Sequence, residues 1–276
     1  MKNLSLKLAA VAFVALGATS AVAGVGGSAD KIHAAINSRS VDAIVAEIER
    51  AENLACTECV DLVATLTAHD RVEVREVAAW WFAKRRSLHK AMADQFLVVL
   101  ASGDTIAVRN AADFLGRSST FRALPALRAA AKRELGPEAR LAMVRAVKHM
   151  HLRGGNEVLT AVMTDKDARV RAAAANAWRE IRKQENAAPV VALLGDASPL
   201  VRAEAATTIG GLRDRAGVAG LEALVVNDPD ATVRRNAAWA LGEIGAASSS
   251  VALGKASGDA SGLVRMTAKV SLGKLH

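Results

Sequence analysis

Apolar side chains recur along this chain with the period of an α-helix, and the helical stretches themselves recur in pairs. From residue 56 onward, a first amphipathic stretch, a short polar turn and a second amphipathic stretch follow one another repeatedly. Apolar positions three and four residues apart form one helix face, and the alternation typical of strands is weak. The predicted first helices cover residues 57–68, 91–101, 123–133, 157–164, 188–194, 217–226 and 249–256. The predicted second helices cover residues 72–86, 106–117, 138–151, 168–183, 199–212, 231–244 and 262–275.

Every second helix begins close to the same dipeptide. Val-Arg occurs in six units, and Ala139-Arg140 takes its place in the remaining one. The arginines are Arg75, Arg109, Arg140, Arg171, Arg202, Arg234 and Arg265, separated by 34, 31, 31, 31, 32 and 31 residues. A fixed period of this size marks an array of stacked units, each of which buries its apolar face against its neighbours. We therefore predict an all-α fold, a right-handed α-solenoid of about seven helix-turn-helix repeats over residues 56–276.

Counting from each arginine separates a core face of the second helix from an exposed face. Offsets −1, +3, +7 and +10 fall on one side, and offset +3 is alanine in six of the seven copies, which lets a neighbouring helix approach closely. Trp178 and Trp81 belong to this core side. Offsets +1, +5 and +8 lie opposite the core, and offsets +5 and +8 carry aromatic and basic residues in several units. These residues form a predicted binding strip of Trp80, Phe114, Arg117, Arg145, Lys148, Arg179 and Trp239.

The region before the array divides into two parts. Residues 24–55 contain two helical patterns without the Val-Arg signature, which suits an N-terminal cap that closes the core. Residues 1–23 have the features of a signal peptide: Lys2 and Lys7 precede an apolar run, and Ala21-Val22-Ala23 precedes a predicted cleavage before Gly24. We therefore expect export to the periplasm or outside of a bacterial cell, with an uncleaved membrane anchor as the alternative.

Composition adds limits to this picture. Hydrophobic residues make up 51% of the chain, yet aromatic residues make up only 3% and tyrosine is absent, so small aliphatic side chains must fill the core. The net charge of +8 permits an acidic partner such as nucleic acid, but charges of both signs are interspersed. This mixture favours a solvated surface over a nucleic-acid interface. The turns before the second helices carry the helix-capping residues Asp70, Asp104, Asp167, Ser198, Asp230 and Ser261.

The repeated unit resembles short HEAT repeats of the type named after phycobilisome lyases. The resemblance rests on an acidic residue just before Val-Arg and small residues after it, clearest in residues 167–174, Asp-Ala-Arg-Val-Arg-Ala-Ala-Ala. It covers residues 56–276 and implies that the seven repeated arginines form a ladder of hydrogen bonds between successive units. Arg140 departs from the pattern, because Glu138 and Ala139 replace the usual aspartate and valine. Lyase activity is not implied, because such repeats serve many proteins.

Cys56 and Cys59 form the sharpest local motif of the chain. They stand at a predicted helix start, where the positive end of the helix dipole favours a thiolate. In an oxidising compartment, two cysteines at this spacing favour a structural disulfide, and a redox role is the alternative. Zinc binding with His33, His69 or His89 is a lesser option, because the second ligand pair lacks a standard spacing.

No catalytic triad, paired acid motif or phosphate-binding glycine loop stands out, so we expect no catalytic residue, cofactor or metal. Second helices line the inner face of such solenoids, which places the binding strip there. The predicted function is an exported, non-catalytic scaffold that binds a protein partner through its concave face. The alternatives are an envelope redox or assembly helper using Cys56 and Cys59, a bilin or haem lyase accessory, and a HEAT-like nucleic-acid-binding protein using Trp80, Asp113 and Arg117.

Overall fold

The computed structural model describes residues 28–54, 56–182, 184 and 186–275, and these form helices without any β-strand. The predicted signal peptide and its cleavage position lie outside the described residues. The helices are α1 (Ala29–Asn37), α2 (Val41–Arg50), α3 (Thr57–Leu66), α4 (Val72–Ala83), α5 (Arg86–Ser102), α6 (Thr105–Arg117), α7 (Leu124–Ala130), α8 (Pro137–Met150), α9 (Asn156–Val162), α10 (Ala168–Arg179), α11 (Ala188–Val191), α12 (Pro199–Leu212), α13 (Val218–Asn227), α14 (Ala231–Ile244), α15 (Ser250–Ala256) and α16 (Gly262–Leu272). Short 3₁₀ helices are η1 (Phe121–Ala123), η2 (Arg153–Gly155), η3 (Ala192–Gly195), η4 (Arg215–Gly217) and η5 (Ala247–Ser249).

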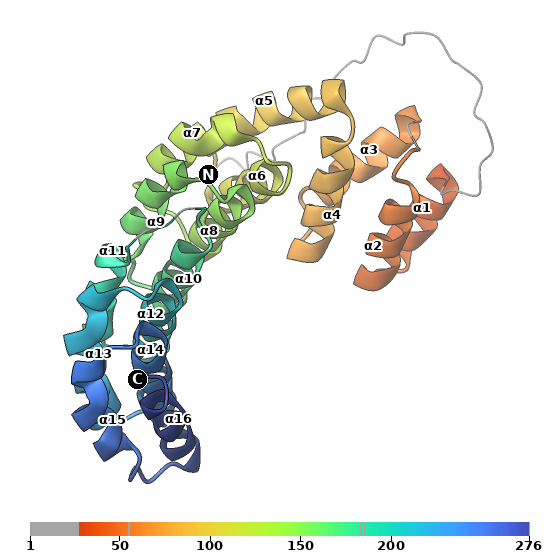
Figure 1. Ribbon diagram of the computed structural model, residues 1–276. Coiled ribbons are helices and arrows are strands. Elements are labelled where there is room, and N and C mark those ends of the chain that lie inside the picture. Colours follow the sequence, from red (N-terminus) through yellow and green to blue (C-terminus); the bar gives the residue numbers. More distant parts are fainter. Residues whose placement is uncertain (1–27, 55, 183, 185, 276) are drawn as a thin grey trace.

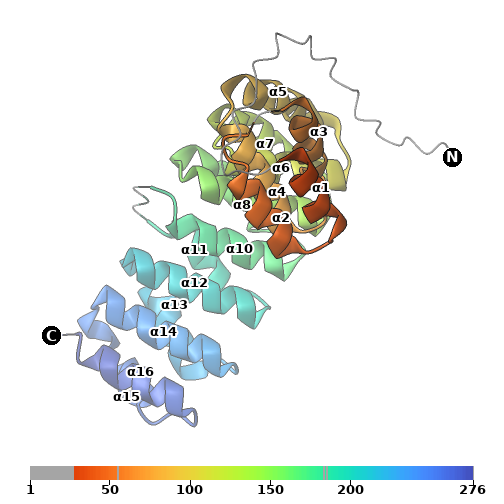
Figure 2. The same cartoon turned by 90° about the vertical axis from the view of Figure 1, so that its right-hand side faces the viewer.

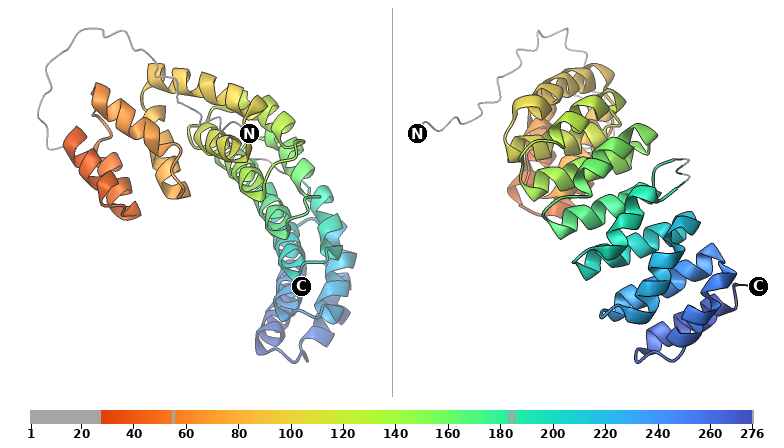
Figure 3. Two further views of the ribbon diagram at one scale, coloured as in Figure 1. Left: turned by 180° about the vertical axis from the view of Figure 1, so that it is seen from behind. Right: turned by 90° about the vertical axis from the view of Figure 1, so that its left-hand side faces the viewer.

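Consecutive helices pair and the pairs stack into an arch, which confirms the predicted all-α solenoid (Figure 1). The even-numbered helices line the inner side of the arch and the odd-numbered helices cover its outer side, as the reverse view also shows (Figure 3). In the C-terminal half, α10, α12, α14 and α16 lie side by side in a regular row (Figure 2). The pair α1 and α2 packs on α3 and α4, so the N-terminal cap continues the stack.

The core is thin and consists largely of small side chains, as the offset pattern predicts. Val74, Ala78, Val170 and Ala174 are fully buried, and all four stand at the predicted core offsets −1 and +3. Successive inner helices approach so closely that a Cβ added to Gly210 would lie 2.6 Å from the Cα atom of Ala240. No helix of the described residues is long and apolar enough to cross a membrane.

The arch bends most where the repeat is longest. The 34-residue step between Arg75 and Arg109 is taken up by α5, which has 17 residues and begins five residues earlier than predicted. Across the bend, His149 Nε2 of α8 lies 3.0 Å from Glu76 Oε1 of α4, so the two helices meet over the intervening α6. The inner face is therefore hollowed at α2, α4, α6 and α8, and is straighter beyond them.

Helix capping follows the sequence at α6, α10 and α14, whereas Ser198 and Ser261 stand at the caps of α12 and α16 without a side-chain cap hydrogen bond. The side chains of Asp104, Asp167 and Asp230 accept backbone N–H groups at the starts of α6, α10 and α14, as predicted. Asp70, by contrast, stands one residue before the cap of α4, and His69 Nδ1 accepts the N–H of Arg71 at 3.1 Å. Asp70 is thereby left 97% exposed in its side chain.

Candidate functional site

In the C-terminal half, the repeated arginines bind carboxylates of the next unit and so join the units. Nε and Nη2 of Arg171 donate to the two oxygens of Asp196 at 2.7 Å each. Arg202 makes the same two-bond contact with Asp228, and Arg234 makes it with Asp259. Each of these arginines also donates from Nη1 to two backbone carbonyls of its own turn, such as Asp165 O for Arg171. Two parallel charge-assisted bonds fix both the distance and the angle between units.

The carboxylates of this ladder stand six residues before each repeated arginine, not at the cap where the sequence analysis placed the acidic residue of the motif. Asp196 and Asp228 each also accept the backbone N–H of the residue two positions later, at 2.8 and 2.9 Å. Their position was missed, although aspartate recurs there as Asp165, Asp196, Asp228 and Asp259. The hydrogen bond from Arg171 holds the pKa of Asp196 below its ordinary value, and Asp228 raises the pKa of Arg202.

The N-terminal half replaces this ladder with a buried cluster. Gly103 stands six residues before Arg109, so Arg75 finds no ladder aspartate and binds Asp113 of α6 instead, at 2.8 Å from Nε and 2.7 Å from Nη2. Arg145 of α8 donates to the same carboxylate from Nε and Nη2 at 3.0 Å each. Asp113 is only 2% exposed, so one buried carboxylate holds three inner helices together.

The remaining repeated arginines depart from the pattern in different ways. Arg140 forms an ion pair with Asp165 of the next unit, so it belongs to the ladder despite its altered sequence. Arg265 reaches two carbonyls of its own turn, and among the described residues it contacts no carboxylate. Arg109 donates to its neighbour Asn110 at 3.0 Å, and its Nη2 lies 3.9 Å from Asp70. The predicted ladder is therefore continuous from Arg140 to Arg234 and interrupted at Arg109.

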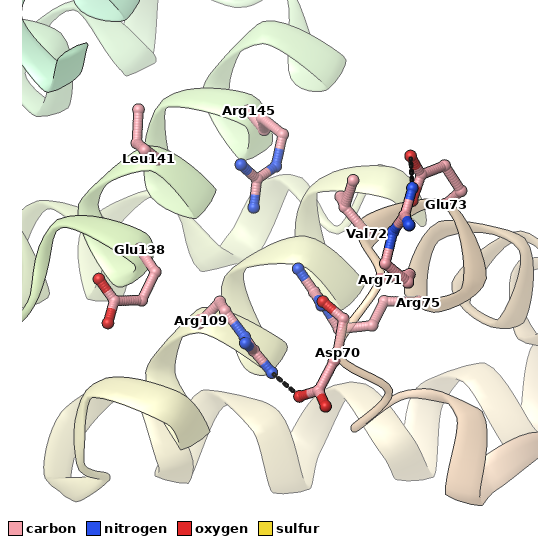
Figure 4. Close-up of a pocket in the computed structure, with 9 residues that line it drawn as sticks. All are labelled: Asp70, Arg71, Val72, Glu73, Arg75, Arg109, Glu138, Leu141 and Arg145. Atoms are coloured by element: carbon pink, nitrogen blue, oxygen red, sulfur yellow. Dashed lines mark hydrogen bonds and ion pairs between the residues drawn. The ribbon is translucent and has the colours of Figure 1, made fainter.

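The interruption leaves a hollow of about 280 Å³ at the N-terminal ends of α4, α6 and α8. Figure 4 shows the guanidinium groups of Arg75, Arg109 and Arg145 turned toward this space, with the carboxylate of Glu138 turned away from them. Burial lowers the pKa of Arg109, and the nearby charge of Arg75 lowers it further. Three guanidinium groups therefore line one side of the hollow, and two of them are paired with Asp113.

A second hollow of about 470 Å³ lies beside it on the inner face, between α2, α4 and α6. Its lining includes Trp80 and Arg117, two members of the predicted binding strip. Four carboxylates, those of Glu49, Glu52, Glu73 and Glu76, line the same hollow. The predicted strip does not include them, because it consists of aromatic and basic residues at offsets +5 and +8, whereas Glu76 stands at offset +1 and the other three lie before Arg75. Lys84 Nζ lies 5.3 Å from the centre of the Trp80 ring, within the range of a cation–π contact.

Three other members of the predicted binding strip lie at or near the surface. Trp239 is half-buried and lines a hollow with Arg235 and Thr267, whereas Lys148 is paired with Glu180 at 2.9 Å. Arg179 is half-buried, and its Cδ atom lies 3.7 Å from the position that a Cβ atom on Gly211 would take.

The prediction for Phe114 is wrong. This residue is 1% exposed and packs against Phe82 and Phe96, because the bend turns this face of α6 toward α5. The face of α6 that carries Phe114 therefore belongs to the core at the bend, although the offset pattern predicts it to be exposed.

Cys56 and Cys59 are joined by a disulfide at the start of α3, with Cα atoms 5.1 Å apart. Cys59 is fully buried against the core, and its N–H donates to Cys56 Sγ at 3.1 Å. His33, His69 and His89 form no metal-ligand cluster with them in the part of the chain that the structure describes. The disulfide therefore closes the turn that leads into the first repeat.

Sequence comparison identifies HEAT repeats over residues 187–273, and a search of curated proteins finds no match. The Escherichia coli protein YibA shares 15% identity and a TM-score of 0.58 over 89% of this chain and 91% of that chain. Human deoxyhypusine hydroxylase shares 18% identity with a TM-score of 0.40 over 90% and 96% of the two chains. The CpcE–CpcF phycocyanin lyase of Nostoc sp. shares 18% identity with a TM-score of 0.41 over 79% and 94% of the two chains.

The likeness to YibA extends the repeat fold over most of the chain, including the bend that the sequence match does not reach. The matched segment itself contains two of the ladder pairs, Arg202 with Asp228 and Arg234 with Asp259. Residues 187–273 of the chain match HEAT repeats, and the helical pairs of the described residues build an α-solenoid.

Proposed function

We propose that this protein is an exported, non-catalytic scaffold that captures a protein partner on its inner face. The observation that carries the proposal is the hollow between α2, α4 and α6, where four glutamates surround the half-buried ring of Trp80. An aromatic ring beside carboxylates suits a lysine or arginine side chain, through cation–π and charge-assisted contacts. The partner segment that enters this hollow is therefore basic.

The local charge supports a basic ligand. Glu49, Glu52, Glu73 and Glu76 face one lining cation, Arg117, although the whole chain has a net charge of +8. Two of these glutamates already hold cations of the chain itself, since Glu52 lies 2.9 Å from Lys84 and Glu76 accepts from His149. Glu49 is exposed and Glu73 has only a 3.3 Å contact with the exposed Arg71, so both carboxylates are accessible to a partner.

The alternatives find less support in the geometry. A nucleic-acid-processing role would use Asp113 as a surface acid, but this carboxylate is buried beneath two guanidinium groups. A redox role would need an accessible cysteine pair, and Cys59 is fully buried, which suits a structural disulfide. Export itself rests on the N-terminal sequence, and amino-terminal sequencing of the chain from a bacterial envelope should begin at Gly24.

Fluorescence anisotropy with labelled peptides tests the proposed binding. A lysine- and arginine-rich peptide should bind the mature chain, and a glutamate-rich peptide of equal length should not. Trp80→Ala should weaken the basic peptide about tenfold or more, as expected for an aromatic contact at the centre of an interface. Phe121→Ala is the control, because Phe121 is also an aromatic residue, is 50% exposed and does not line this hollow. Equal binding of both peptides, or equal losses in both variants, would refute the proposal.

A further inference from the structure

We propose that the hollow between α4, α6 and α8 is a binding site for a carboxylate group, with Arg109 as its principal ligand and Arg75 and Arg145 beside it. This site is separate from the acidic hollow around Trp80. The proposal does not depend on the capture of a protein partner, because it follows from a buried hydrogen-bond donor of Arg109 that has no partner among the described residues.

The ladder itself shows what an arginine at this repeat position binds. Arg171, Arg202 and Arg234 each hold both oxygens of one aspartate, with all donor–acceptor distances between 2.6 and 3.0 Å. Arg109 occupies the equivalent position at the start of α6, yet its Nη2 is buried and has no hydrogen-bond partner among the described residues. A buried donor without a partner is destabilising, and a bound carboxylate would satisfy it.

The turn before α8 explains why the chain supplies no carboxylate there. By the register of the ladder, the partner of Arg109 should stand six residues before Arg140, and that residue is Glu134, which is exposed. In the other turns the ladder aspartate also accepts a backbone N–H, but here Thr105 Oγ1 accepts the N–H of Gly136 at 2.9 Å. Arg133 donates to the carbonyls of Leu100 and Gly103, which further ties this turn to the preceding one. The turn is therefore anchored without an aspartate.

The charges inside the hollow also favour an anion. Arg75, Arg109 and Arg145 surround the single buried carboxylate of Asp113, which already accepts four hydrogen bonds from two of them. Asp70 does not balance the excess, because its side chain is 97% exposed and lies 3.9 Å from Arg109, beyond hydrogen-bond range. A ligand carboxylate would displace Asp70 from this position and pair with Arg109 directly.

The remaining lining defines the ligand further. Val72 and Leu141 supply apolar walls, whereas Glu73 and Glu138 place negative charge at the edge. This combination fits one carboxylate on a short aliphatic stem and disfavours a second negative charge. Such a group is carried either by a small free acid or by a glutamate side chain of a protein, and both present the same chemistry to Arg109.

Calorimetric titration of the full mature chain tests the site and distinguishes the two sources. The free-acid arm compares valerate with its neutral isostere valeramide, and the peptide arm compares a peptide containing one glutamate with its glutamine counterpart. We expect the acid to bind in at least one arm and the neutral isostere in neither. Binding of valerate identifies a free acid as sufficient, whereas binding of the peptide alone indicates a protein-borne carboxylate.

Two variants establish that the hollow holds the acid. Arg109→Gln should weaken binding at least tenfold. Arg265→Gln should leave it unchanged, because Arg265 also has no carboxylate partner in the part of the chain that the structure describes but lies exposed in α16, away from the hollow. Asp70→Asn should strengthen binding, since it removes the carboxylate nearest to Arg109, and it alters no buried group. Three outcomes would overturn the proposal. The acid and its neutral isostere could bind with equal affinity, the acid could fail to bind in both arms, or Arg109→Gln could bind the acid as tightly as the parent chain. If Arg109→Gln fails to fold, a weaker or unchanged affinity in Asp70→Asn overturns it instead.

Discussion

Arg75 and Asp113 lie 38 residues apart in the chain and form a buried ion pair, with Nη2 and Oδ2 2.7 Å apart. Arg75 is 3% exposed and Asp113 is 2% exposed, so water does not screen the pair. Arg145 completes the cluster from a third helix. This arrangement joins α4, α6 and α8 at the bend, where the regular arginine–aspartate ladder is missing.

Asp113→Ala should be among the most destabilising single substitutions in the chain. It leaves Arg75 buried without its carboxylate and also frees Arg145, and breaking a buried pair in this way costs about 3–5 kcal/mol. Urea unfolding followed by circular dichroism measures the loss. Asp70→Ala is the control, because its side chain is almost fully exposed, and its effect should stay within about 0.5 kcal/mol. Similar losses in the two variants would show that the cluster does not stabilise the bend.

Arg202→Ala should lower the free energy of unfolding by about 2–3 kcal/mol, because Arg202 holds two oxygens of the buried Asp228. Arg265→Ala removes a repeated arginine whose bonds, among the described residues, are to carbonyls of its own turn, and its effect should be clearly smaller. Thermal melts of both variants provide the comparison. Equal shifts in melting temperature would mean that the contact between units adds nothing to the contact within the turn.

The stability of the array should depend on pH in the acidic range. Hydrogen bonds from Arg171 and Arg234 hold the pKa values of Asp196 and Asp259 below their ordinary value of 3.8. Below that value the unfolded chain takes up protons before the folded chain does, so stability falls as the pH drops through the folded-state pKa values and is fully present above about pH 5. Urea midpoints measured from pH 7 to pH 2 should be level first and then decline.

A double variant tests the source of this decline. Asp196→Asn with Asp259→Asn removes both titrating carboxylates while keeping side chains of similar size. Its stability should be lower at neutral pH and should change less below pH 4 than that of the parent chain. An equally steep acid decline in the double variant would assign the effect to other groups.

Gly210→Ala should destabilise the array by about 1–3 kcal/mol, because the added Cβ would lie 2.6 Å from the backbone of Ala240 and force two inner helices apart. Gly254→Ala is a matched helical control with no atom within 4 Å of the added Cβ, and alanine there should stabilise α15 by up to about 1 kcal/mol. Opposite signs in the two melts are expected. The same sign in both would contradict the close packing of α12 on α14.

The sequence was sufficient to predict the repeat architecture, because the buried offsets are filled by the same small residues in most units. Val170 and Ala174 are fully buried as predicted, and Trp178 closes the same face at 4% exposure. The helical pairs from α3 onward correspond to the predicted units, although individual helix ends differ by several residues. Local spacing determines these features, so no knowledge of the neighbouring units was needed.

The candidate sites were less accessible to sequence reasoning, because they depend on how adjacent units are oriented. Phe114 has the offset of an exposed residue, but the bend at α5 and α6 places it in the core. Asp113 is not marked by any repeat, and its role appears only when Arg75 and Arg145 are brought together in space. Gly103 is the sequence signal that the ladder is interrupted here, because it stands where later units carry an aspartate six residues before the repeated arginine.

The central claim is that the inner face at Trp80 receives a protein partner, and site-specific photo-crosslinking tests it most directly. A benzoylphenylalanine placed at Val45 would stand in the acidic hollow with Trp80 left in place, and one placed at Val98, 67% exposed on the outer helix α5, serves as the control. Irradiation with the basic peptide should give an adduct from position 45 that excess unlabelled peptide abolishes, and none from position 98. Adducts of equal yield from both positions, or from position 98 alone, would contradict binding on the inner face.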